Sequence, residues 1–278
     1  MKKFKNDLEI AKYLLKIEKK AFNTARKNKI DIKAKQSDKC LHDLVTNYDT
    51  TIERALIAQL NRDFDHPKIV SEEYNSKEEA KGTYFTIDPI DGTLNFANRI
   101  NLWSVQIAYV RDNELVASAL YNPETDSYHA ALNFGAYKNG KRFFTEHKPI
   151  DRQLFTIPED KDEHIKIIKA INEITLQYRR IGSASIALEW VAEGKIGAYI
   201  LRKNTSSWDI YPGFLLASEA GGVIDETLDY IIVANDTDSL KRYKAMIEIA
   251  VGRSTKEDEK PSETKSKRRK VSDKIRQK

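Results

Sequence analysis

The sequence predicts a mixed fold, α+β in its first half and α/β in its second. The chain opens with two amphipathic helical patterns and continues with a series of strand patterns that are joined by short turns. After those strands, helix and strand patterns alternate. Consecutive strands with short connections favour an antiparallel sheet, whereas alternation favours a second, smaller α/β sheet. We therefore expect an antiparallel N-terminal sheet covered by two helices, followed by a smaller α/β half.

The first half contains two helices and several strands. Apolar residues recur at helical spacing over residues 8–25 and again over residues 52–60. The β-branched and aromatic run at 83–87 predicts a buried strand, and Ile69-Val70-Ser71 predicts a shorter one. The remaining strands of this half are expected at 103–110, 115–121 and 127–131, with a hairpin over 134–140.

The second half alternates helix and strand. Helices are expected at 163–173, at 185–193 and around Asp209, with strands at 178–181 and 197–201. Pro212 predicts that the last helix begins late or is irregular, because proline disfavours helical geometry at the residue before it. We divide the chain into an N-terminal subdomain (1–152), a C-terminal subdomain (153–252) and a disordered basic tail (253–278).

The stretch from Asp88 to Thr93, Asp-Pro-Ile-Asp-Gly-Thr, is the most informative part of the chain. It places two carboxylates three residues apart at the end of a predicted strand. Pro89 fixes its own φ and interrupts the ladder, while Gly92 permits a backbone conformation closed to other residues. Asp, Pro and Gly are also favoured in ordinary turns. The motif alone therefore leaves a plain turn and a metal-binding loop equally open.

Two further acidic sites favour metal binding. Glu72 follows a short apolar strand, and Asp209 precedes an amphipathic stretch that ends in Glu-Ala-Gly-Gly. Two carboxylates about 4 Å apart repel by about 4 kcal/mol at an effective dielectric near 20, so a fold that brings these acids together needs cations. Sites made of carboxylate oxygens suit Mg²⁺, with Mn²⁺ as a substitute.

These motifs resemble those of the inositol monophosphatase family of Mg²⁺-dependent, lithium-sensitive phosphatases. The resemblance covers roughly residues 5–250 and includes four motifs in the family's order. They are D-L-V-T-x-x-D at 43–49, the acidic pair at 72–73, D-P-I-D-G-T-x-N-F at 88–96 and W-D…E-A-G-G at 208–222. The resemblance implies the layered αβαβα sugar-phosphatase fold, phosphomonoesterase activity and a homodimer.

The same resemblance implies a set of metal ligands. Glu72, Asp88 and the backbone carbonyl of Ile90 are expected to bind a first Mg²⁺ ion. Asp88, Asp91 and Asp209 are expected to bind a second, and Glu72 is expected to help hold a weaker third. With two or three ions in place, one ion activates water and another stabilises the leaving alkoxide.

Water activation and phosphate binding are carried over in the same way. Thr93 and Asp49 match the family pair that orients and deprotonates the attacking water. The phosphate is expected to meet Asp91 and the backbone N–H groups of Gly92 and Thr93, where a short helix begins. Ala184 matches a substrate-contacting position in the family's G-[ST]-x-[AS] segment.

Substrate identity depends on a departure from the family pattern. Where inositol-cleaving members place an acid, six residues before Trp208, this chain has Arg202. Arginine accepts no hydrogen bond from a ring hydroxyl but can bind a second phosphate or a carboxylate. We therefore weigh sugar bisphosphates, NADP and 3',5'-bisphosphonucleosides ahead of, or beside, inositol and sugar phosphates, and leave open that Arg202 points to solvent.

Other chemistries find little support in the residues. Cys40 is the sole cysteine, and the five histidines show no metal-binding spacing. The glycines form neither a nucleotide-triphosphate loop nor a dinucleotide fingerprint. The chain has no apolar run long enough for a membrane span and no signal peptide, so we expect a cytoplasmic protein.

The basic tail raises an alternative from another class. Residues 253–278 hold eleven Lys or Arg and five Asp or Glu, whereas residues 1–252 hold 36 and 37. The tail has the composition of a disordered segment and is expected to have no dedicated partner, although RNA, DNA or membrane contact stays open. A noncatalytic phosphate-binding or regulatory protein that uses this tail is the alternative to the phosphatase. The presence of every metal and water position favours the phosphatase.

Overall fold

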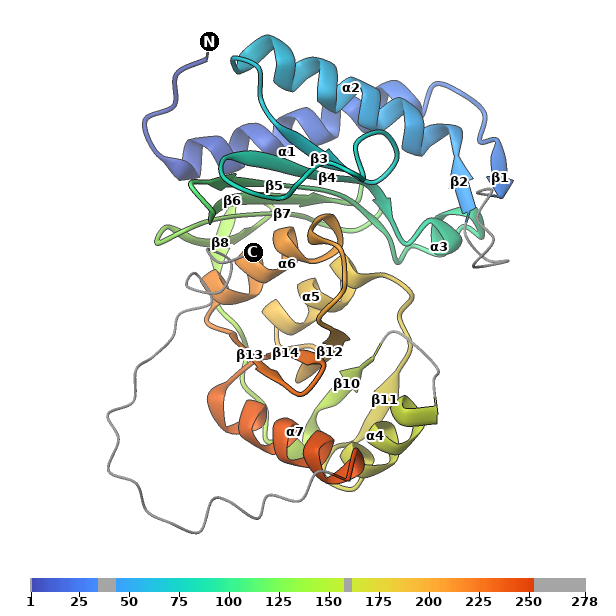
Figure 1. Cartoon of the computed structure of the whole chain (residues 1–278), viewed down its shortest axis with the longest axis vertical. Coiled ribbons are helices and arrows are strands. Elements are labelled where there is room, and N and C mark those ends of the chain that lie inside the picture. The colour runs from blue at the N-terminus through green and yellow to red at the C-terminus, as the bar shows by residue number, and fades with distance from the viewer. Residues whose placement is uncertain (1, 35–43, 158–161, 253–278) are drawn as a thin grey trace.

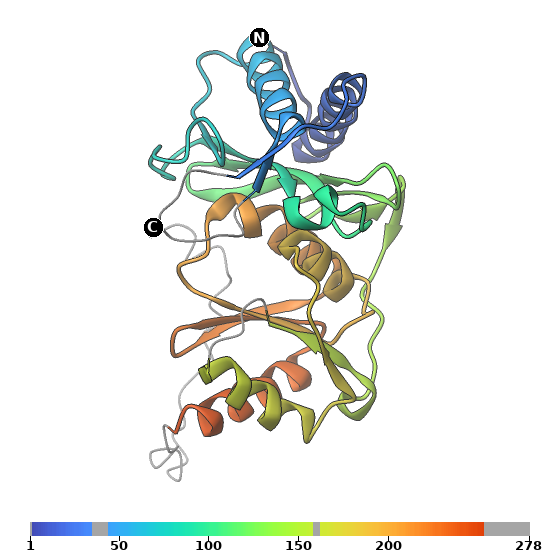
Figure 2. The same cartoon turned by 90° about the vertical axis from the view of Figure 1, so that its right-hand side faces the viewer.

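The computed structural model describes residues 2–34, 44–157 and 162–252, and its elements form five layers (Figure 1). Helices α1 (Asp7–Ala25) and α2 (Asn47–Asp63) cover one face of a seven-stranded sheet. Helices α5 (Ala184–Ala192) and α6 (Ser207–Ala220) lie between that sheet and a five-stranded sheet. Helices α4 (Asp162–Asn172) and α7 (Thr237–Ala250) cover the far side, as Figure 2 also shows. The expected αβαβα layering is confirmed.

The seven-stranded sheet contains the strands of the first half in chain order. Its strands are β3 (Ile69–Ser71), β4 (Tyr84–Asp91), β5 (Ser104–Arg111), β6 (Glu114–Tyr121), β7 (Ser127–Ala131), β8 (Gly135–Lys138) and β9 (Lys141–Phe143). All neighbours are antiparallel except β3 and β4, which run parallel. The expected antiparallel sheet is confirmed, with one parallel pair at this edge, where the long connection between the two strands lets the chain return in the same direction.

The five-stranded sheet has the order β11-β10-β12-β14-β13. Its strands are β10 (Leu154–Thr156), β11 (Gln177–Arg179), β12 (Ala198–Arg202), β13 (Val223–Thr227) and β14 (Tyr230–Ala234). The strands β10, β11 and β12 are parallel to one another, while β13 and β14 form an antiparallel edge. The sequence reading did not include β13, β14 or α7. Smaller elements complete the description: β1 (Ile32–Ala34), β2 (Leu44–Thr46), α3 (Thr93–Ala97) and a 3-10 turn, η1 (Ile150–Arg152).

Three apolar cores hold the layers together. One lies between α1, α2 and the first sheet, one surrounds α5 and α6, and one lies under α4 and α7. The middle core includes Tyr84 of the first sheet and Val233 of the second, so the two sheets share it. The first sheet ends at Phe143 and the second begins at Leu154. The division at residue 152 stays a prediction, and the tail lies outside the described residues.

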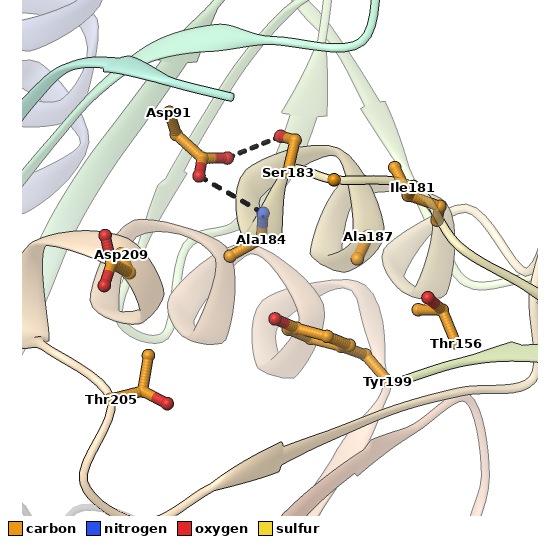
Figure 3. Close-up of a pocket in the computed structure, with 10 residues that line it drawn as sticks. Asp91, Thr156, Ile181, Ser183, Ala184, Ala187, Tyr199, Thr205 and Asp209 are labelled. Atoms are coloured by element: carbon orange, nitrogen blue, oxygen red, sulfur yellow. Dashed lines mark hydrogen bonds between the residues drawn. The ribbon is translucent and has the colours of Figure 1, made fainter. Parts of the chain in front are cut away.

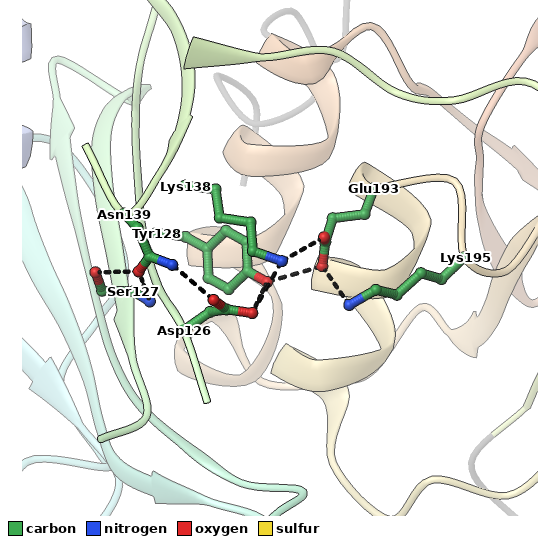
Figure 4. A network of polar contacts seen from close by, with 7 residues as sticks. All are labelled: Asp126, Ser127, Tyr128, Lys138, Asn139, Glu193 and Lys195. Carbon is green, nitrogen blue, oxygen red and sulfur yellow. Dashed lines mark hydrogen bonds and ion pairs between the residues drawn. The ribbon is translucent and has the colours of Figure 1, made fainter. Parts of the chain in front are cut away.

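A polar network joins the C-terminal end of α5 to the first sheet (Figure 4). The carboxylate of Glu193 accepts hydrogen bonds from Tyr128 Oη at 2.8 Å and from Lys138 Nζ at 2.6 Å. Lys138 also pairs with Asp126 at 2.9 Å. Because these side chains come from β7, β8 and the turn before them, the network anchors α5 across the layer boundary.

Helix α6 differs from the sequence expectation. It begins at Ser207 and continues through Pro212, which lies inside the helix and is buried. The expected late start is wrong. The helix begins before the proline because Ser206 stands in the extended conformation at the N-cap, and the buried apolar face of α6 supports the turns on both sides of Pro212.

Candidate active site

Three carboxylates converge where β4, α5 and α6 meet. Asp88, Asp91 and Asp209 each offer an oxygen, and these oxygens all lie within 4.8 Å of one another. Asp88 and Asp91 belong to β4, and Asp209 belongs to the first turn of α6. Asp209 is more than a hundred residues from Asp88 and Asp91 in the sequence, so the packing of α6 against the first sheet completes the cluster.

A β-bulge directs the two aspartates of β4. Asp88 pairs with Gln106 of β5 and Asp91 pairs with Ser104, so Pro89 and Ile90 together oppose a single residue. The bulge leaves Pro89 free of a ladder bond that it has no N–H to make. We expected the strand to stop at Asp88, and it instead resumes at Asp91. In a regular strand, side chains three residues apart point to opposite faces of the sheet. The extra residue of the bulge lets both carboxylates point to the site.

Asp88 is buried with few compensating donors. Its carboxylate accepts hydrogen bonds from the backbone N–H of Ile90 at 3.0 Å and from Gln106 Nε2 at 3.4 Å. Burial, followed by the charges of Glu72, Asp91 and Asp209, raises the pKa of Asp88 well above its ordinary value. A cation among these carboxylates would relieve that repulsion. The donor set consists of oxygen atoms and fits a hard divalent ion such as Mg²⁺.

Glu72 lies beside this cluster. Its backbone N–H donates to the carbonyl of Ile87 at 3.2 Å, which continues the pairing of β3 with β4 past the end of β3. The parallel pairing therefore brings Glu72 alongside the C-terminal end of β4. Its effect on the pKa of Asp88 agrees with that position.

Asp91 is held by the N-terminal end of α5. Its carboxylate accepts hydrogen bonds from the hydroxyls of Ser183 and Ser185. The backbone N–H groups of Ala184 and Ser185 donate to it at 3.2 and 2.7 Å. Ser185 Oγ also accepts a hydrogen bond from Ser104 Oγ of β5 at 2.8 Å. These contacts fix the orientation of Asp91, and the sequence reading assigned a role only to Ala184.

Asp49 and Thr93 meet next to the cluster. Asp49 is fully buried, and burial raises its pKa to about 6. Its Oδ1 atom lies 3.4 Å from Thr93 Oγ1, and its Oδ2 atom accepts from Thr46 N at 2.8 Å and from the Thr46 hydroxyl. The Thr93 hydroxyl also donates to the carbonyl of Ile90 at 2.9 Å. The structure thus brings the predicted water-activating pair together, beside the carbonyl predicted as a metal ligand.

Gly92 makes the turn that joins β4 to α3. Its φ is +88°, and a Cβ there would lie 2.8 Å from the carbonyl oxygen of Leu102 and 3.1 Å from Ser183 Cβ. A side chain would therefore meet both strain and a steric clash. Thr93 follows as the first residue of α3, which places its hydroxyl toward Asp49.

A cavity of about 360 Å³ opens beside the acids (Figure 3). Asp91 and Asp209 contribute to its wall, and Ser183 and Ala184 line it from the start of α5. The rest of the described lining is hydroxyl-bearing or small and apolar: Thr156, Ile181, Gly182, Ala187, Tyr199 and Thr205. The sequence did not indicate Thr156, Tyr199 or Thr205, because tertiary packing brings them to this cavity, Thr156 and Tyr199 from the second sheet and Thr205 from the loop between β12 and α6.

Arg202 does not line this cavity. Its guanidinium pairs with Glu163 at 3.3 Å and lies 4.7 Å from the centre of the Tyr230 ring. The Tyr230 hydroxyl also donates to Glu163. The guanidinium is therefore engaged with α4 and β14 in this structure, and the substrate contact of Arg202 stays a prediction.

The comparisons with known proteins agree with the geometry. The sequence profile of the inositol monophosphatase family matches residues 3–229. A protein of Neisseria meningitidis described as a putative Nus factor SuhB is 31% identical over 201 residues, which cover 69% of this chain and 77% of that protein. The fructose-1,6-bisphosphatase/inositol-1-monophosphatase of Aquifex aeolicus is 28% identical over 235 residues, covering 80% and 86%.

A solved structure of an IMPase/NADP phosphatase, complexed with Mg²⁺ and phosphate, has the same fold. Its TM-score is 0.74 at 21% identity, with 90% of this chain and 97% of that chain covered. The family profile extends from α1 to the turn between β13 and β14 and includes every acid described above. The chain therefore belongs to the inositol monophosphatase family.

Proposed function

We propose that this protein is a Mg²⁺-dependent phosphomonoesterase. The observation that carries the proposal is the convergence of Asp88, Asp91 and Asp209 beside the Asp49–Thr93 pair. Acids that repel one another in a buried site gain from a cation, and a buried base next to a hydroxyl is suited to moving a proton. The carboxylate cluster and the Asp49–Thr93 pair occurring together suit hydrolysis of a phosphate ester.

The residues that would hold the cations are those expected from the family. Asp88, Asp91, Asp209, Glu72 and the carbonyl of Ile90 would hold two or three Mg²⁺ ions, with Mn²⁺ as a substitute. When bound, such ions neutralise phosphate charge, lower the pKa of water and stabilise the leaving oxygen. Ser183 and Ser185 would keep Asp91 oriented before the ion arrives.

We propose that Asp49 and Thr93 position the attacking water. With its pKa raised to about 6, Asp49 is ionised near neutral pH and is still basic enough to accept a proton. The Thr93 hydroxyl lies between Asp49 and the Ile90 carbonyl, so its oxygen is available to hold a water molecule. The N–H groups of Gly92 and Thr93 are proposed to bind the phosphate, and Ala184 is proposed to contact the remainder of the substrate.

The residues that line the cavity indicate which class of substrate it suits. Its described lining includes no Lys or Arg, and besides Ser183, whose hydroxyl donates to Asp91, its hydroxyls come from Thr156, Tyr199 and Thr205. Such a wall suits a compact polyhydroxylated group, so we propose inositol or sugar monophosphates ahead of substrates with a second phosphate. A sugar bisphosphate, NADP or a 3',5'-bisphosphonucleoside would have to draw Arg202 away from Glu163.

A substrate panel tests the proposal. Phosphate release is measured for monophosphates and bisphosphates with and without Mg²⁺, and we expect turnover that requires the ion. Absence of turnover for every compound at saturating Mg²⁺ would instead support the noncatalytic alternative, which the relative described as a putative Nus factor keeps in view. Repeating the panel with Arg202→Glu separates the substrate classes. If Arg202 stays on Glu163, the ratio of kcat/KM values for bisphosphate and monophosphate is unchanged.

Quaternary structure rests on the family alone. We propose a homodimer and a cytoplasmic location, as the sequence resemblance and composition led us to expect. Among the described helices, none combines the length and apolar character that a membrane span needs. Sedimentation velocity on the full chain would give the mass of the particle directly.

A further inference from the structure

The charge of this protein is unevenly distributed along the chain. Residues 1–33 contain eleven Lys or Arg and four Asp or Glu, a net charge of +7. Residues 34–252 contain 25 basic and 33 acidic residues, a net charge of −8. The near-neutral total over residues 1–252 therefore conceals a basic N-terminal segment, most of which is helix α1.

The basic residues of α1 lie on its outer face. Lys12, Lys16 and Lys20 are exposed and follow at four-residue spacing, which puts them along one side of the helix over about 12 Å. Lys19 lies next to this line, and Lys27 is exposed just after the helix ends. We call these five residues the lysine face. Between Ile10 and Ile30 the single acid is Glu18, which is fully buried beneath the helix.

No described carboxylate neutralises the lysine face through an ion pair. Lys20 Nζ donates to the amide oxygen of Gln59 at 3.1 Å, and Lys19 Nζ donates to Ser127 Oγ at 3.4 Å. Both partners are neutral. Beneath the helix, burial and then the charges of Lys12 and Lys19 lower the pKa of His129 to about 4. The positive potential of this face is therefore felt within the sheet below it.

The position of the lysine face separates it from the active site. Helix α1 lies in the outermost layer (Figures 1 and 2), whereas the cavity beside Asp91 and Asp209 is lined from α5, α6, the second sheet and the loops that join them. Lysines in that layer do not line the cavity. The fold does not require them either, because the apolar side of α1 already packs on the sheet through residues such as Leu14 and Ile17.

We propose that the lysine face binds the phosphate backbone of a nucleic-acid duplex without reading its sequence. A row of lysines that form no ion pair with a described carboxylate attracts a regularly charged polyanion through release of its counterions. The aromatic ring next to the face is Tyr121, which is half-buried and lies 5.4 Å from Lys19 Nζ, and a single covered ring offers little platform for stacking successive unpaired bases; this favours a duplex over a single strand. An anionic membrane fits less well, because the apolar side of α1 is buried and the exposed Ile30 and Ile32 lie beyond the helix.

Titration of the full chain with labelled DNA and RNA duplexes of about 20 base pairs, at salt from about 50 to 200 mM, tests the proposal. The test variant combines Lys12→Glu, Lys16→Glu and Lys20→Glu. The matched control combines Lys166→Glu, Lys169→Glu and Lys241→Glu, which are exposed on α4 and α7 in the opposite outer layer. Both triple variants change the net charge equally and keep the basic tail, so their difference reports the lysine face.

We expect the test variant to bind at least about tenfold more weakly at low salt and to lose about 2.7 from the slope of log affinity against log salt. The control should keep the wild-type slope, and both variants should keep the wild-type rate of phosphate release. Equal effects of the two triple variants, or no duplex binding by the wild type at low salt, would overturn the proposal. Tighter binding to phosphatidylserine vesicles than to either duplex, with the same lysine dependence, would assign the face to a membrane instead.

Discussion

Asp91 shows what sequence alone leaves out at the scale of single residues. The motif identifies the aspartate, but its hydrogen-bond partners Ser183 and Ser185 lie about ninety residues further along the chain. Their Gly-Ser-Ala-Ser context is visible in the sequence, where it also fits ordinary helix capping. Arg202 is a second example: its departure from the family pattern is visible in the sequence, but its partners Glu163 and Tyr230 are not.

Removal of one hydroxyl from this cluster should weaken metal binding. Ser185→Ala deletes a donor to Asp91 and the partner of Ser104, while the backbone N–H of residue 185 remains. Changes in the groups that hold a metal ligand typically cost 10- to 100-fold in affinity, so we expect about tenfold weaker Mg²⁺ binding by calorimetry. Ser218→Ala, at an exposed serine of α6, is the control. Equal Mg²⁺ affinity in the two variants would show that the Ser185 hydroxyl does not position Asp91.

His129 predicts a pH dependence of stability. Its pKa is lowered to about 4 from the ordinary 6.5, so the folded protein binds this proton less readily than the unfolded chain. Stability should therefore be present above pH 6.5 and fall progressively as the pH drops towards 4. His129→Phe keeps a ring that can stack on Tyr137 and removes the titrating group. Its melting temperature should fall less than that of the wild type between pH 7.5 and 5.5, whereas His147→Phe, at an exposed position, should follow the wild type.

At the scale of elements, the sequence predicts most of the regular structure and misses its irregularities. Helix α1 and strands β3, β5, β6 and β7 lie close to their expected ranges because their apolar periods are clear. The bulge at Pro89 and Ile90 and the passage of α6 through Pro212 are not visible from propensity. Both depend on tertiary packing, which holds a strand or a helix together across a residue that disfavours it.

The start of α2 couples helix stability to the proposed base. Thr46 is the N-cap: its hydroxyl accepts from Tyr48 N at 3.1 Å, and its backbone N–H donates to the Asp49 carboxylate at 2.8 Å, which completes a capping box. The Thr46 hydroxyl also donates to Asp49. Thr46→Val should cost about 1 kcal/mol of stability in urea unfolding. Loss of the hydrogen bond from the Thr46 hydroxyl to Asp49 should also raise the pKa of Asp49 further above 6, so the acidic limb of the pH–rate profile moves to higher pH. Thr46→Ser should restore both, and a Val variant with an unmoved acidic limb would exclude Asp49 as the base.

At the scale of the whole molecule, the layered architecture could be predicted from the sequence. The packing of helices from the second half against the first sheet could not. The two expected halves correspond to the two sheets, yet α5 and α6 of the second half cover the first sheet and complete the site. Sequence periodicity identifies helices and strands but not which face each one meets. For the same reason the near-zero net charge of residues 1–252 gives no sign of the lysines of α1, which the fold places together on one outer surface.

We propose that the converging carboxylates bind divalent cations for hydrolysis of a phosphomonoester. Phosphate release from the best substrate of the panel, measured as Mg²⁺ is titrated, tests it most directly in the wild type, in Asp88→Asn and in the exposed control Asp65→Asn. We predict saturable dependence on Mg²⁺ in the wild type and the control, and a loss of about 100-fold or more in Asp88→Asn. Turnover independent of Mg²⁺, or near-normal turnover in Asp88→Asn, would contradict the claim.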